Sequence, residues 1–260
     1  MPLNLLVCVK GTVSSTSGAL RPEGQPLSPS PLDEYAVEEA LRLKERVPGS
    51  KTAALSLGTP ASEEPLRSVL SLGVESAVLL CDEAFAGGDP VSSAYLLSLA
   101  VRKLSAAAPV QLVLCGKKTN DGESGQVGPA LAAWLGWPSA CAVRKVVEVS
   151  ETSLTVERAL EGGVETLALS FPAVLTLTKE INEPRLPSLK GKMAARKAQI
   201  PRWGASDLGA DAALYGKSAA TSVVKTAPVP PRAGGVSIPG NTPEEKARAL
   251  AEKLKEMKLL

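Results

Sequence analysis

The chain has 260 residues, of which 44% are hydrophobic and only 3% aromatic, so it can bury one large core or two modest ones built mainly from Ala, Val and Leu. Its formal net charge is +2, with acids and bases interspersed, which argues against a nucleic acid or an anionic membrane as partner. It contains no histidine, the commonest general base and transition-metal ligand. We therefore expect a protein that holds a ligand rather than an enzyme that transforms one, with no metal site.

The cysteines and the first residues indicate a reducing, cytoplasmic location. The four cysteines form no CxxC pair, and two lie in strand-like apolar runs, as expected of small buried thiols rather than a disulfide framework. The opening MPLNLLVCVK places its lysine after the apolar run, so it predicts a strand and not a signal peptide. No run approaches the roughly 18 apolar residues of a membrane-spanning helix, so we expect no membrane insertion.

The first elements are a strand, a loop and a helix. Leu3–Val9 is a nearly continuous apolar run, typical of a strand buried on both faces. Gly11–Pro29 is rich in Ser, Thr, Gly and Pro without periodicity, which predicts a long surface loop. Ser30 then begins a helix as its N-cap, with Pro31 at the first helical position. Asp33, at the third position, completes a predicted capping box.

Three further strands are predicted before residue 116, over Thr52–Leu57, Ser76–Leu80 and Val110–Cys115. Helices capped by Ser62 and by Asp89 separate them. Strands that alternate with helices of this length predict βαβ units and a parallel sheet. Ligands of such sheets bind beyond the carboxyl ends of the strands, where the strand order reverses. Because the first and fourth strands both lead into unusual loops, we expect the reversal between these two strands.

The segment Cys115–Pro138, which follows the fourth strand, is the most informative in the chain. Its glycines allow tight turns and a close approach of the backbone to a ligand, and it leads into a predicted helix over Gln126–Leu135. The free N–H groups at that helix start suit an anion, and Lys117 and Lys118 add positive charge. The segment is neither GxGxxG nor a Walker loop. On its own it fits a phosphate cradle or a simple strand-to-helix turn equally well.

The pattern changes after Pro138. Arg144–Val149, Leu154–Ala159 and Glu165–Ser170 are short alternating runs, and the last two are joined around Gly162 and Gly163, which predicts a hairpin. Ala173–Thr178 again resembles a buried strand. A basic, proline-bearing segment over residues 182–197 should project from the body. We expect an extended arm over Pro201–Gly240, then a terminal helix capped by the residues Thr242-Pro243-Glu244-Glu245.

Four ordered stretches make the chain resemble the β (small) subunit of electron transfer flavoproteins over essentially its whole length. These are LLVCVK at residues 5–10, PLDEYAVEEALRLKE at 31–45, GK-x3-DG-x3-QVG at 116–128 with LGWP at 135–138, and INEPRLPSLKGKMAARK at 181–197. One departure concerns Gly11–Ser17, which is small and hydroxyl-rich where the family commonly has a Val-Pro-Asp-like turn. The contacts of that loop are therefore not carried over from the family.

The resemblance implies a Rossmann-like α/β fold of the adenine-nucleotide α-hydrolase type with an added β-hairpin. It also implies a non-catalytic subunit of a heterodimeric electron carrier. In the family the redox-active FAD lies mostly on the α subunit, while the β subunit buries a structural AMP or a second FAD. The partners so implied are an α subunit, acyl-CoA-type dehydrogenases of fatty acid β-oxidation and a quinone oxidoreductase.

We accordingly expect an adenine nucleotide at the carboxyl ends of the strands and at the first turns of the following helices. Asp121 cannot favourably face a phosphate, so we expect it to brace its loop through backbone N–H groups. The positions expected to contribute to the nucleotide site are Val9, Leu32, Asp33, Ser56, Gly116, Asp121, Gly122, Glu123, Ser124, Gly125, Gln126 and Val127.

Two stretches are expected to meet partner proteins. The resemblance implies that residues 182–197, which we call the recognition segment, anchor dehydrogenases by Leu189, and Leu186 and Met193 extend the same apolar set. It also implies that Glu165 pairs with an arginine of the α subunit. The expected organisation is an α/β domain over residues 1–197, followed by an arm and terminal helix over residues 198–260 that pack on the partner subunit.

Two other function classes fit parts of the sequence. An ATP- or AMP-binding regulatory module of the universal-stress type has a similar core and glycine-rich loop, but it does not explain the recognition segment or the proline-rich arm. An ATP-pyrophosphatase enzyme needs an SGGxDS-like loop directly after the first strand, and Lys10–Ser17 contains none.

Overall fold

The computed structural model describes residues 1–13, 26–225, 227 and 234–260. Most of the predicted 11–29 loop, together with Pro228, Pro230 and Pro231 of the predicted arm, lies outside the described residues. The chain divides into two compact units, Met1–Thr226 and Ala227–Leu260. Each unit is described by itself.

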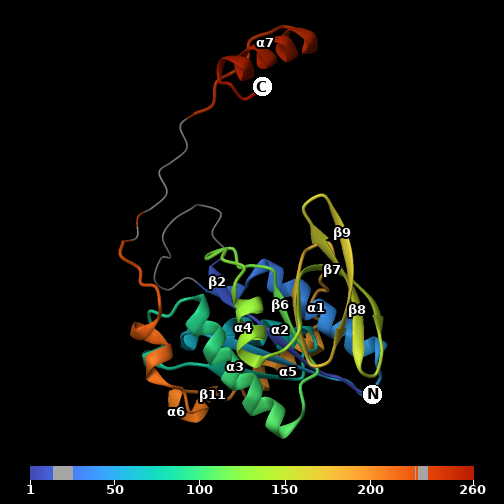
Figure 1. The fold of residues 1–260 in the computed structure, drawn as a ribbon, viewed down its shortest axis with the longest axis vertical. Coiled ribbons are helices and arrows are strands. Elements are labelled where there is room, and N and C mark those ends of the chain that lie inside the picture. Colours follow the sequence, from blue (N-terminus) through green and yellow to red (C-terminus); the bar gives the residue numbers. More distant parts are fainter. Residues whose placement is uncertain (14–25, 226, 228–233) are drawn as a thin grey trace. The chain divides into compact units, whose positions relative to one another are not determined.

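The first unit is built on a nine-stranded sheet with the order β11-β5-β4-β1-β6-β10-β7-β8-β9 (Figure 1). Every neighbouring pair from β11 to β7 is parallel, and only the β7–β8 and β8–β9 pairs are antiparallel. The strands are β1 (Asn4–Cys8), β4 (Lys51–Leu57), β5 (Ser76–Leu80), β6 (Leu112–Gly116), β7 (Ser139–Val149), β8 (Ser153–Leu160), β9 (Gly163–Ser170), β10 (Ala173–Leu177) and β11 (Arg202–Trp203).

The strand order reverses at β1, as predicted. On one side β1 pairs with β4, and on the other it pairs with β6, with Leu5 opposite Leu112 and Val7 opposite Leu114. The chain therefore winds outward from β1 in both directions, which leaves a crevice at the carboxyl ends of β1 and β6. The predicted α/β fold with a Rossmann-like parallel sheet is confirmed.

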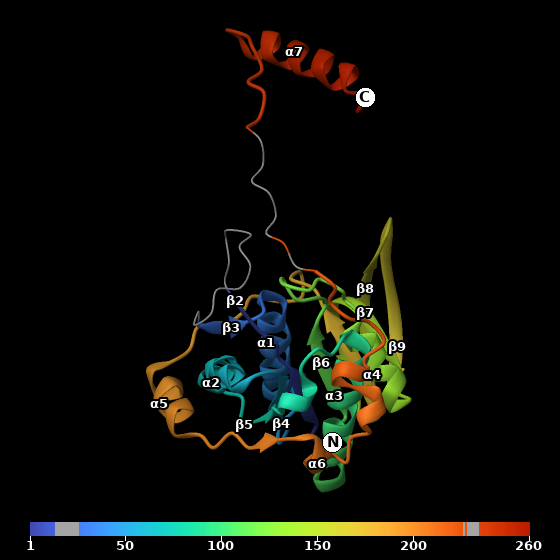
Figure 2. The same cartoon turned by 90° about the vertical axis from the view of Figure 1, so that its left-hand side faces the viewer.

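Helices cover both faces of the sheet (Figure 2). The face with α1 (Pro31–Arg46), α2 (Glu63–Leu72) and α5 (Leu189–Lys197) buries Leu5 and Val7 of β1 in one apolar cluster. The opposite face, with α3 (Pro90–Ala107) and α4 (Val127–Leu135), buries Leu6 and Cys8 in a second cluster. Successive side chains of a strand point to opposite faces, and with both faces covered the strand must be continuously apolar. This is the reason that the first residues read as an unbroken hydrophobic run.

Strands β7, β8 and β9 extend the sheet as an antiparallel ribbon (Figure 1). The hairpin predicted around Gly162 and Gly163 is confirmed, since Arg158 pairs with Glu165 and Leu160 with Gly163 across it. Strand β7 begins at Ser139, five residues before the predicted Arg144, because its first residues pair in parallel with β10. In this amino-terminal part Ala140 and Val143 are buried, whereas Ser139 is exposed.

Three segments predicted as irregular contain regular structure. The ends of the 11–29 loop, β2 (Gly11–Val13) and β3 (Leu27–Pro29), pair as an antiparallel ladder. The recognition segment contains α5, and the first part of the predicted arm contains β11, α6 (Ala205–Leu208), η3 (Ala212–Leu214) and η4 (Gly216–Ser218). These elements belong to the first compact unit, which extends to Thr226.

The capping box predicted for α1 is wrong. Ser30 does occupy the N-cap position, but among the described residues its hydroxyl has no hydrogen-bond partner. The Asp33 carboxylate accepts hydrogen bonds from the N–H groups of Lys10 and Gly116 instead. Asp33 is thus used for a tertiary contact that the local sequence does not reveal.

The second unit contains α7 (Pro243–Glu256). The Thr242 hydroxyl accepts a hydrogen bond from the Glu245 N–H, as in half of the predicted capping box, while the Glu245 carboxylate accepts from the N–H of Asn241. Leu250 and Met257 are exposed within this unit. No helix among the described residues is long and apolar enough to cross a lipid bilayer.

Helix α5 packs closely on α2. A Cβ atom built on Gly191 would collide with the carbonyl oxygen of Ser71 in α2, so only glycine permits this approach. Arg67 of α2 donates to the carbonyl oxygen of Ala195 at 2.7 Å, near the last turn of α5, and Ala195 is itself buried. The recognition segment is therefore anchored to the domain at its carboxyl end.

Replacing Gly191 by Ala should force α5 away from α2, because the obstructing atom belongs to the α2 backbone and not to a flexible side chain. Overpacking of this kind costs about 1–3 kcal/mol, to be measured as the change in unfolding free energy in urea. Gly163→Ala is the matched control, because a Cβ there meets nothing within 4 Å. Equal stability of the two variants would mean that α5 can shift without cost.

Candidate functional site

A cavity of about 540 Å³ lies at the carboxyl ends of β1, β4 and β6. Cys8, Leu55 and Cys115 line it from these strands, and the starts of α3 and α4 complete its wall. Pockets of roughly 300–1,000 Å³ accommodate small molecules and cofactors. The cavity thus occupies the crevice that the reversal of strand order creates, the position at which doubly wound sheets bind ligands.

The surroundings of the cavity suit an anionic group. Helix α3 begins beside it at Pro90, after Asp89 as N-cap, and α4 begins beside it at Val127. The first N–H groups of a helix lack partners within the helix and carry its positive dipole end. Lys10, Lys117 and Lys118 also line the cavity. The start of α4, which no side chain caps, and the lysines supply donors and positive charge for a phosphate, although Lys10 pairs with Asp121 and Lys118 with Glu123. The start of α3 is already capped by the Asp89 carboxylate, which accepts from the Ser92 N–H at 2.8 Å.

Asp33 joins the two strand ends that form the crevice. Its Oδ2 accepts a hydrogen bond from the Lys10 N–H at 2.8 Å, just after β1, and its Oδ1 accepts from the Gly116 N–H at 3.1 Å, at the end of β6. The residue is only 4% exposed and lines the cavity. A single carboxylate from α1 thereby fixes the spacing of the two chain segments that lead into the loops around the site.

The contact between Asp33 and Gly116 requires glycine. A Cβ on Gly116 would lie 2.5 Å from the Asp33 Oδ1, 2.7 Å from the carbonyl carbon of Leu32 and 2.9 Å from the Asp33 N. Two of these three atoms are backbone atoms at the start of α1, which cannot turn away as a side chain can. Gly116 is thus needed for the close approach of two elements and not for a turn of its own.

Burial makes the Asp33 carboxyl group a weaker acid than usual. Desolvation raises the pKa of its carboxyl group to about 7, although the hydrogen bonds from Lys10 and Gly116 act in the opposite direction. Near neutral pH the group is therefore partly protonated, which reduces its repulsion of an anion in the cavity. The neighbouring thiol of Cys115 stays protonated, because the contact with Cys8 and burial raise its pKa.

Asp121 organises the loop between β6 and α4. Its carboxylate accepts from the Gly122 N–H at 2.7 Å and from the Thr119 hydroxyl at 2.7 Å, and it pairs with the Lys10 Nζ at 2.9 Å. Desolvation raises its pKa, but Lys10 and Thr119 together bring the pKa below its usual value. Asp121 is thus ionised, bound to its own loop, and linked to the segment after β1.

The structure brings most of the predicted nucleotide positions together around the cavity. Those that line it are Val9, Asp33, Gly116, Gly122, Ser124, Gly125, Gln126 and Val127. Asp121 braces the loop instead, and Glu123 pairs with Lys118 at 3.1 Å. Leu32 approaches the site only through its backbone beside Gly116. Ser56 lies buried between the lining residues Leu55 and Leu57, and among the described residues its hydroxyl has no partner.

Several lining residues were not predicted. The largest group comes from the start of α3, namely Gly88, Asp89, Pro90 and Ser93. A usable signal existed, because right-handed crossovers place the start of each helix at the same edge as the strand ends. Val223 also lines the cavity. The sequence did not predict this position, because Val223 lies in a stretch without periodicity. Thr221, two residues earlier, donates to the Asp89 carboxylate from its N–H at 3.1 Å.

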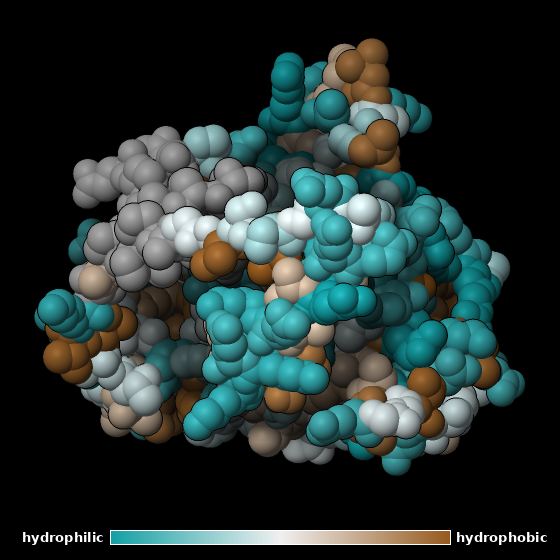
Figure 3. Space-filling model, turned by 90° about the horizontal axis from the view of Figure 1, so that it is seen from above, coloured by the Kyte–Doolittle hydropathy of each residue, from teal (hydrophilic) through white to brown (hydrophobic). Residues whose placement is uncertain are grey.

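The apolar residues of the recognition segment are exposed. The exposed fraction is 91% for Leu186, 77% for Leu189 and 57% for Met193. Leu189 and Met193 are four residues apart on α5, so they share one face of the helix. On the face drawn in Figure 3, hydrophobic side chains stand in separate groups among hydrophilic ones. Because Leu186, Leu189 and Met193 are all exposed and lie on one segment, that segment is a candidate contact surface.

Glu165, the other predicted partner residue, lies in β9. Its carboxylate accepts from the Arg158 Nε at 2.6 Å, directly across the ladder on β8. The side chain is 40% exposed, so the pair lies at the surface. Among the described residues no group of His, Cys, Asp and Glu is arranged to hold a metal ion.

Comparison with known proteins assigns the family. The model of the electron transfer flavoprotein domain matches residues 19–208. This chain belongs to the electron transfer flavoprotein family. It is 37% identical over 261 residues to electron transfer flavoprotein subunit beta of Thermoanaerobacterium thermosaccharolyticum, covering 97% of this chain and 98% of that protein. The resemblance to the β subunits of the family is thereby confirmed.

Other relatives of this electron transfer flavoprotein chain extend along its whole length. Protein FixA of Bradyrhizobium diazoefficiens is 34% identical, with 95% of this chain and 89% of that protein covered. The caffeyl-CoA reductase-Etf complex subunit CarD of Acetobacterium woodii is 32% identical, with 99% and 100% covered.

The raised pKa of Asp33 makes the stability of this chain depend on pH. Its pKa is about 7 in the folded chain and 3.8 as the ordinary value, so the folded state binds more protons between these values. The stabilising contribution is complete below about pH 4 and is lost as the pH rises through 7. Relative to the unsubstituted protein, Asp33→Asn should gain about 4 kcal/mol over this range, at about 1.4 kcal/mol per pKa unit.

Urea denaturation of both proteins at pH 4.5, 6 and 7.5 measures this difference. Asp82→Asn serves as control, because hydrogen bonds from the N–H groups of Ala205 and Ala84 lower the pKa of Asp82. The contribution of Asp82 is lost only below its ordinary pKa, so its stability difference should stay constant over the same range. A constant difference for Asp33→Asn as well would show that Asp33 is ionised at pH 4.5.

Proposed function

We propose that this chain is the β subunit of a heterodimeric electron transfer flavoprotein. In this proposal it pairs with an α subunit that carries the redox-active FAD. The heterodimer accepts electrons from acyl-CoA or other flavin dehydrogenases and passes them to a quinone-reductase-type acceptor. The chain itself acts as a carrier subunit without a catalytic constellation of its own, and the arm and terminal helix over residues 198–260 contribute to packing on the α subunit.

The observation that carries the proposal is the cavity at the reversal of the sheet in a chain of this family. Its residues fit an adenine nucleotide, either AMP or the adenosine diphosphate part of a second FAD. The loop between β6 and α4 and the start of α4 would hold the phosphate, together with Lys10 and Lys117. Val9, Leu55 and Leu97 offer an apolar wall to the base. AMP supplies no chemistry there, whereas a second FAD would add a redox centre.

The recognition segment supports the dehydrogenase part of the proposal. Leu186, Leu189 and Met193 are exposed while the helix that carries two of them is fixed on α2. Exposed apolar side chains on a fixed scaffold are suited to insertion into a partner pocket, since little order must be created on binding. We propose these three residues, together with Glu165 at the β8–β9 hairpin for the α subunit, as partner contacts.

The nucleotide proposal predicts the effect of a bulky residue at Gly125. This glycine has φ +64° and lines the cavity, and a Cβ there would lie 3.3 Å from the Lys117 carbonyl oxygen. Gly125→Val should lower the adenine nucleotide recovered per purified heterodimer several-fold or more, while the circular dichroism of the strands is unchanged. Gly136→Val is the control, because Gly136 also has positive φ but lies at the end of α4, with no neighbour within 4 Å.

Extraction and quantification of AMP and FAD from the heterodimer provide the readout. A purified heterodimer that contains no adenine nucleotide beyond one FAD, yet unfolds at a normal temperature, would contradict the nucleotide proposal. A nucleotide loss in Gly136→Val equal to that in Gly125→Val would instead assign the effect to backbone strain.

The docking proposal predicts a large effect at Leu189. Truncation of a central apolar anchor at an interface costs about 2 kcal/mol or more, so Leu189→Ala should slow electron transfer from the dehydrogenase by about thirtyfold at limiting concentration. Flavin content and heterodimer assembly should not change, because Leu189 is 77% exposed in this chain. Substitution of Lys190 or Lys192 should affect the association rate in a salt-dependent manner.

Stopped-flow or steady-state reduction of the heterodimer by the dehydrogenase measures this rate. Val147→Ala offers a matched control, because Val147 is also exposed but lies in β7, outside the recognition segment and the β8–β9 hairpin. The docking role is wrong if Leu189→Ala destabilises the heterodimer and leaves dehydrogenase turnover unchanged.

A further inference from the structure

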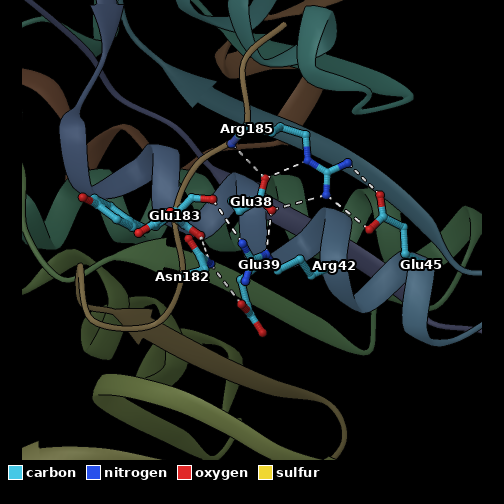
Figure 4. A network of polar contacts seen from close by, with 8 residues as sticks. Glu38, Glu39, Arg42, Glu45, Asn182, Glu183 and Arg185 are labelled. Carbon is cyan, nitrogen blue, oxygen red and sulfur yellow. Dashed lines mark hydrogen bonds and ion pairs between the residues drawn. The ribbon is translucent and has the colours of Figure 1, made fainter.

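The amino-terminal half of the recognition segment is tied to α1 by a polar network (Figure 4). Asn182 donates from its Nδ2 to the Tyr35 carbonyl oxygen at 3.1 Å and to the Glu39 Oε2 at 3.0 Å. Arg185 donates from its Nε to the Glu38 Oε2 at 2.8 Å and from its NH1 to the Glu45 Oε1 at 2.6 Å. The segment is thus held against one helix at two positions before its exposed leucines begin.

Glu38 is the centre of this network. Its side chain is only 4% exposed, and it accepts from the Arg42 Nε at 2.6 Å as well as from Arg185. Desolvation raises the pKa of Glu38, but the hydrogen bonds from Arg185 and Arg42 bring it below its ordinary value. Hydrogen bonds to Glu45 and to Glu38 raise the pKa of Arg185. Glu38 is therefore buried as a carboxylate that Arg185 and Arg42 neutralise together.

The network fixes the main chain at Arg185 and not only its side chain. The N–H of Arg185 also donates to the Glu38 Oε2, at 3.2 Å. Pro184 and Pro187 flank this position and restrict the backbone on either side. Leu186, whose exposed fraction is 91%, follows directly. Because the Leu186 side chain is so exposed, its position is set by the backbone at Arg185 and Leu186.

The carboxyl-terminal half of the segment is fixed independently. Ser188 caps α5 by accepting from the Gly191 N–H at 3.0 Å, and Gly191 and Ala195 pack α5 on α2. The stretch that contains Leu186 and Leu189 is therefore suspended between two anchors, the carboxylates of α1 and the backbone of α2. Release of either anchor would let the apolar residues spread over many positions, which lowers affinity for a shaped partner pocket.

We infer that Arg185 is a positioning residue for partner docking, because its fork between Glu38 and Glu45 holds Leu186 and Leu189 in the arrangement that a dehydrogenase surface accepts. The inference rests on the docking role assigned to the recognition segment under the proposed function. A buried ion pair is a weak source of net stability, so fixing the geometry of an exposed binding stretch is its main consequence here.

The test compares variants in the complete heterodimer with its bound cofactors. The probe is the acyl-CoA dehydrogenase of the same organism that reduces the unsubstituted heterodimer fastest, itself reduced by its acyl-CoA substrate. Arg185→Lys keeps the positive charge but cannot bridge two carboxylates with a planar fork. We expect it to raise the KM of the dehydrogenase for the heterodimer about tenfold. The kcat and the FAD and nucleotide content of the heterodimer should stay within a factor of two of their original values.

A double substitution separates positioning from a general structural effect. If Arg185 acts through the leucines, Arg185→Lys combined with Leu189→Ala should be little worse than Leu189→Ala alone. Independent effects would multiply instead, and this result would overturn the inference. Arg102→Lys is the matched control: Arg102 of α3 also donates to a neighbouring helix, to the Trp134 carbonyl oxygen of α4 at 2.6 Å, but lies outside the recognition segment. Its KM should be unchanged.

Glu45→Gln provides a second route in case Arg185→Lys assembles poorly. The Glu45 side chain is 61% exposed and receives two Arg185 hydrogen bonds, so its substitution loosens the fork without burying an unpaired charge. We expect a KM increase of about threefold. If Leu189→Ala impairs transfer but neither Arg185→Lys nor Glu45→Gln changes KM, the positioning role is wrong and docking stands. If Leu189→Ala has no effect, both the docking role and this inference fail.

Discussion

The site depends on the carboxyl group of Asp33, which spans the ends of β1 and β6. These are the two strands between which the order of the sheet reverses, and a crevice opens there because the following chains leave to opposite faces. Asp33 binds the N–H of Lys10, two residues beyond β1, and the last N–H of β6. The loop that it helps to fix carries Gly122, Gly125 and Gln126 to the cavity. Loss of this bridge would free both borders of the site together.

The charge balance of the cavity follows from the different burial of two carboxylates. Asp33 is buried, and its pKa of about 7 leaves it partly neutral, whereas Asp121 is half-exposed, paired with Lys10 and ionised. A buried carboxyl group that keeps its proton can sit beside an anion at little electrostatic cost. An ionised one is tolerated where a lysine and an N–H group already neutralise it. The same residue type therefore serves as a bridge in one place and as a loop brace in the other.

The sequence predicted most strands of the sheet, the reversal at β1, the hairpin at Gly162 and most of the glycine-rich lining, because these depend on local patterns of period and turn chemistry. It failed where a residue serves a tertiary contact. Asp33 at the third position of a helix favours a capping box, but its partners are 23 and 83 residues away in sequence. Helix α5 was missed because Pro184 and Pro187 indicate a loop, while its stability comes from Gly191 and Ala195 against α2. The position of Val223 at the cavity was also missed, because its stretch of sequence has no periodic pattern.

Helix α1 connects the cavity with the recognition segment. Its first turn directs Asp33 to the cavity, its middle directs Glu38 and Glu39 to the recognition segment, and its last turn directs Glu45 to the same segment (Figure 4). Between them Ala36, Val37, Ala40 and Leu41 are buried against the sheet, so the helix cannot turn or slide without a loss of core packing. One rigid helix therefore fixes the position of the exposed leucines relative to the strand ends that border the cavity.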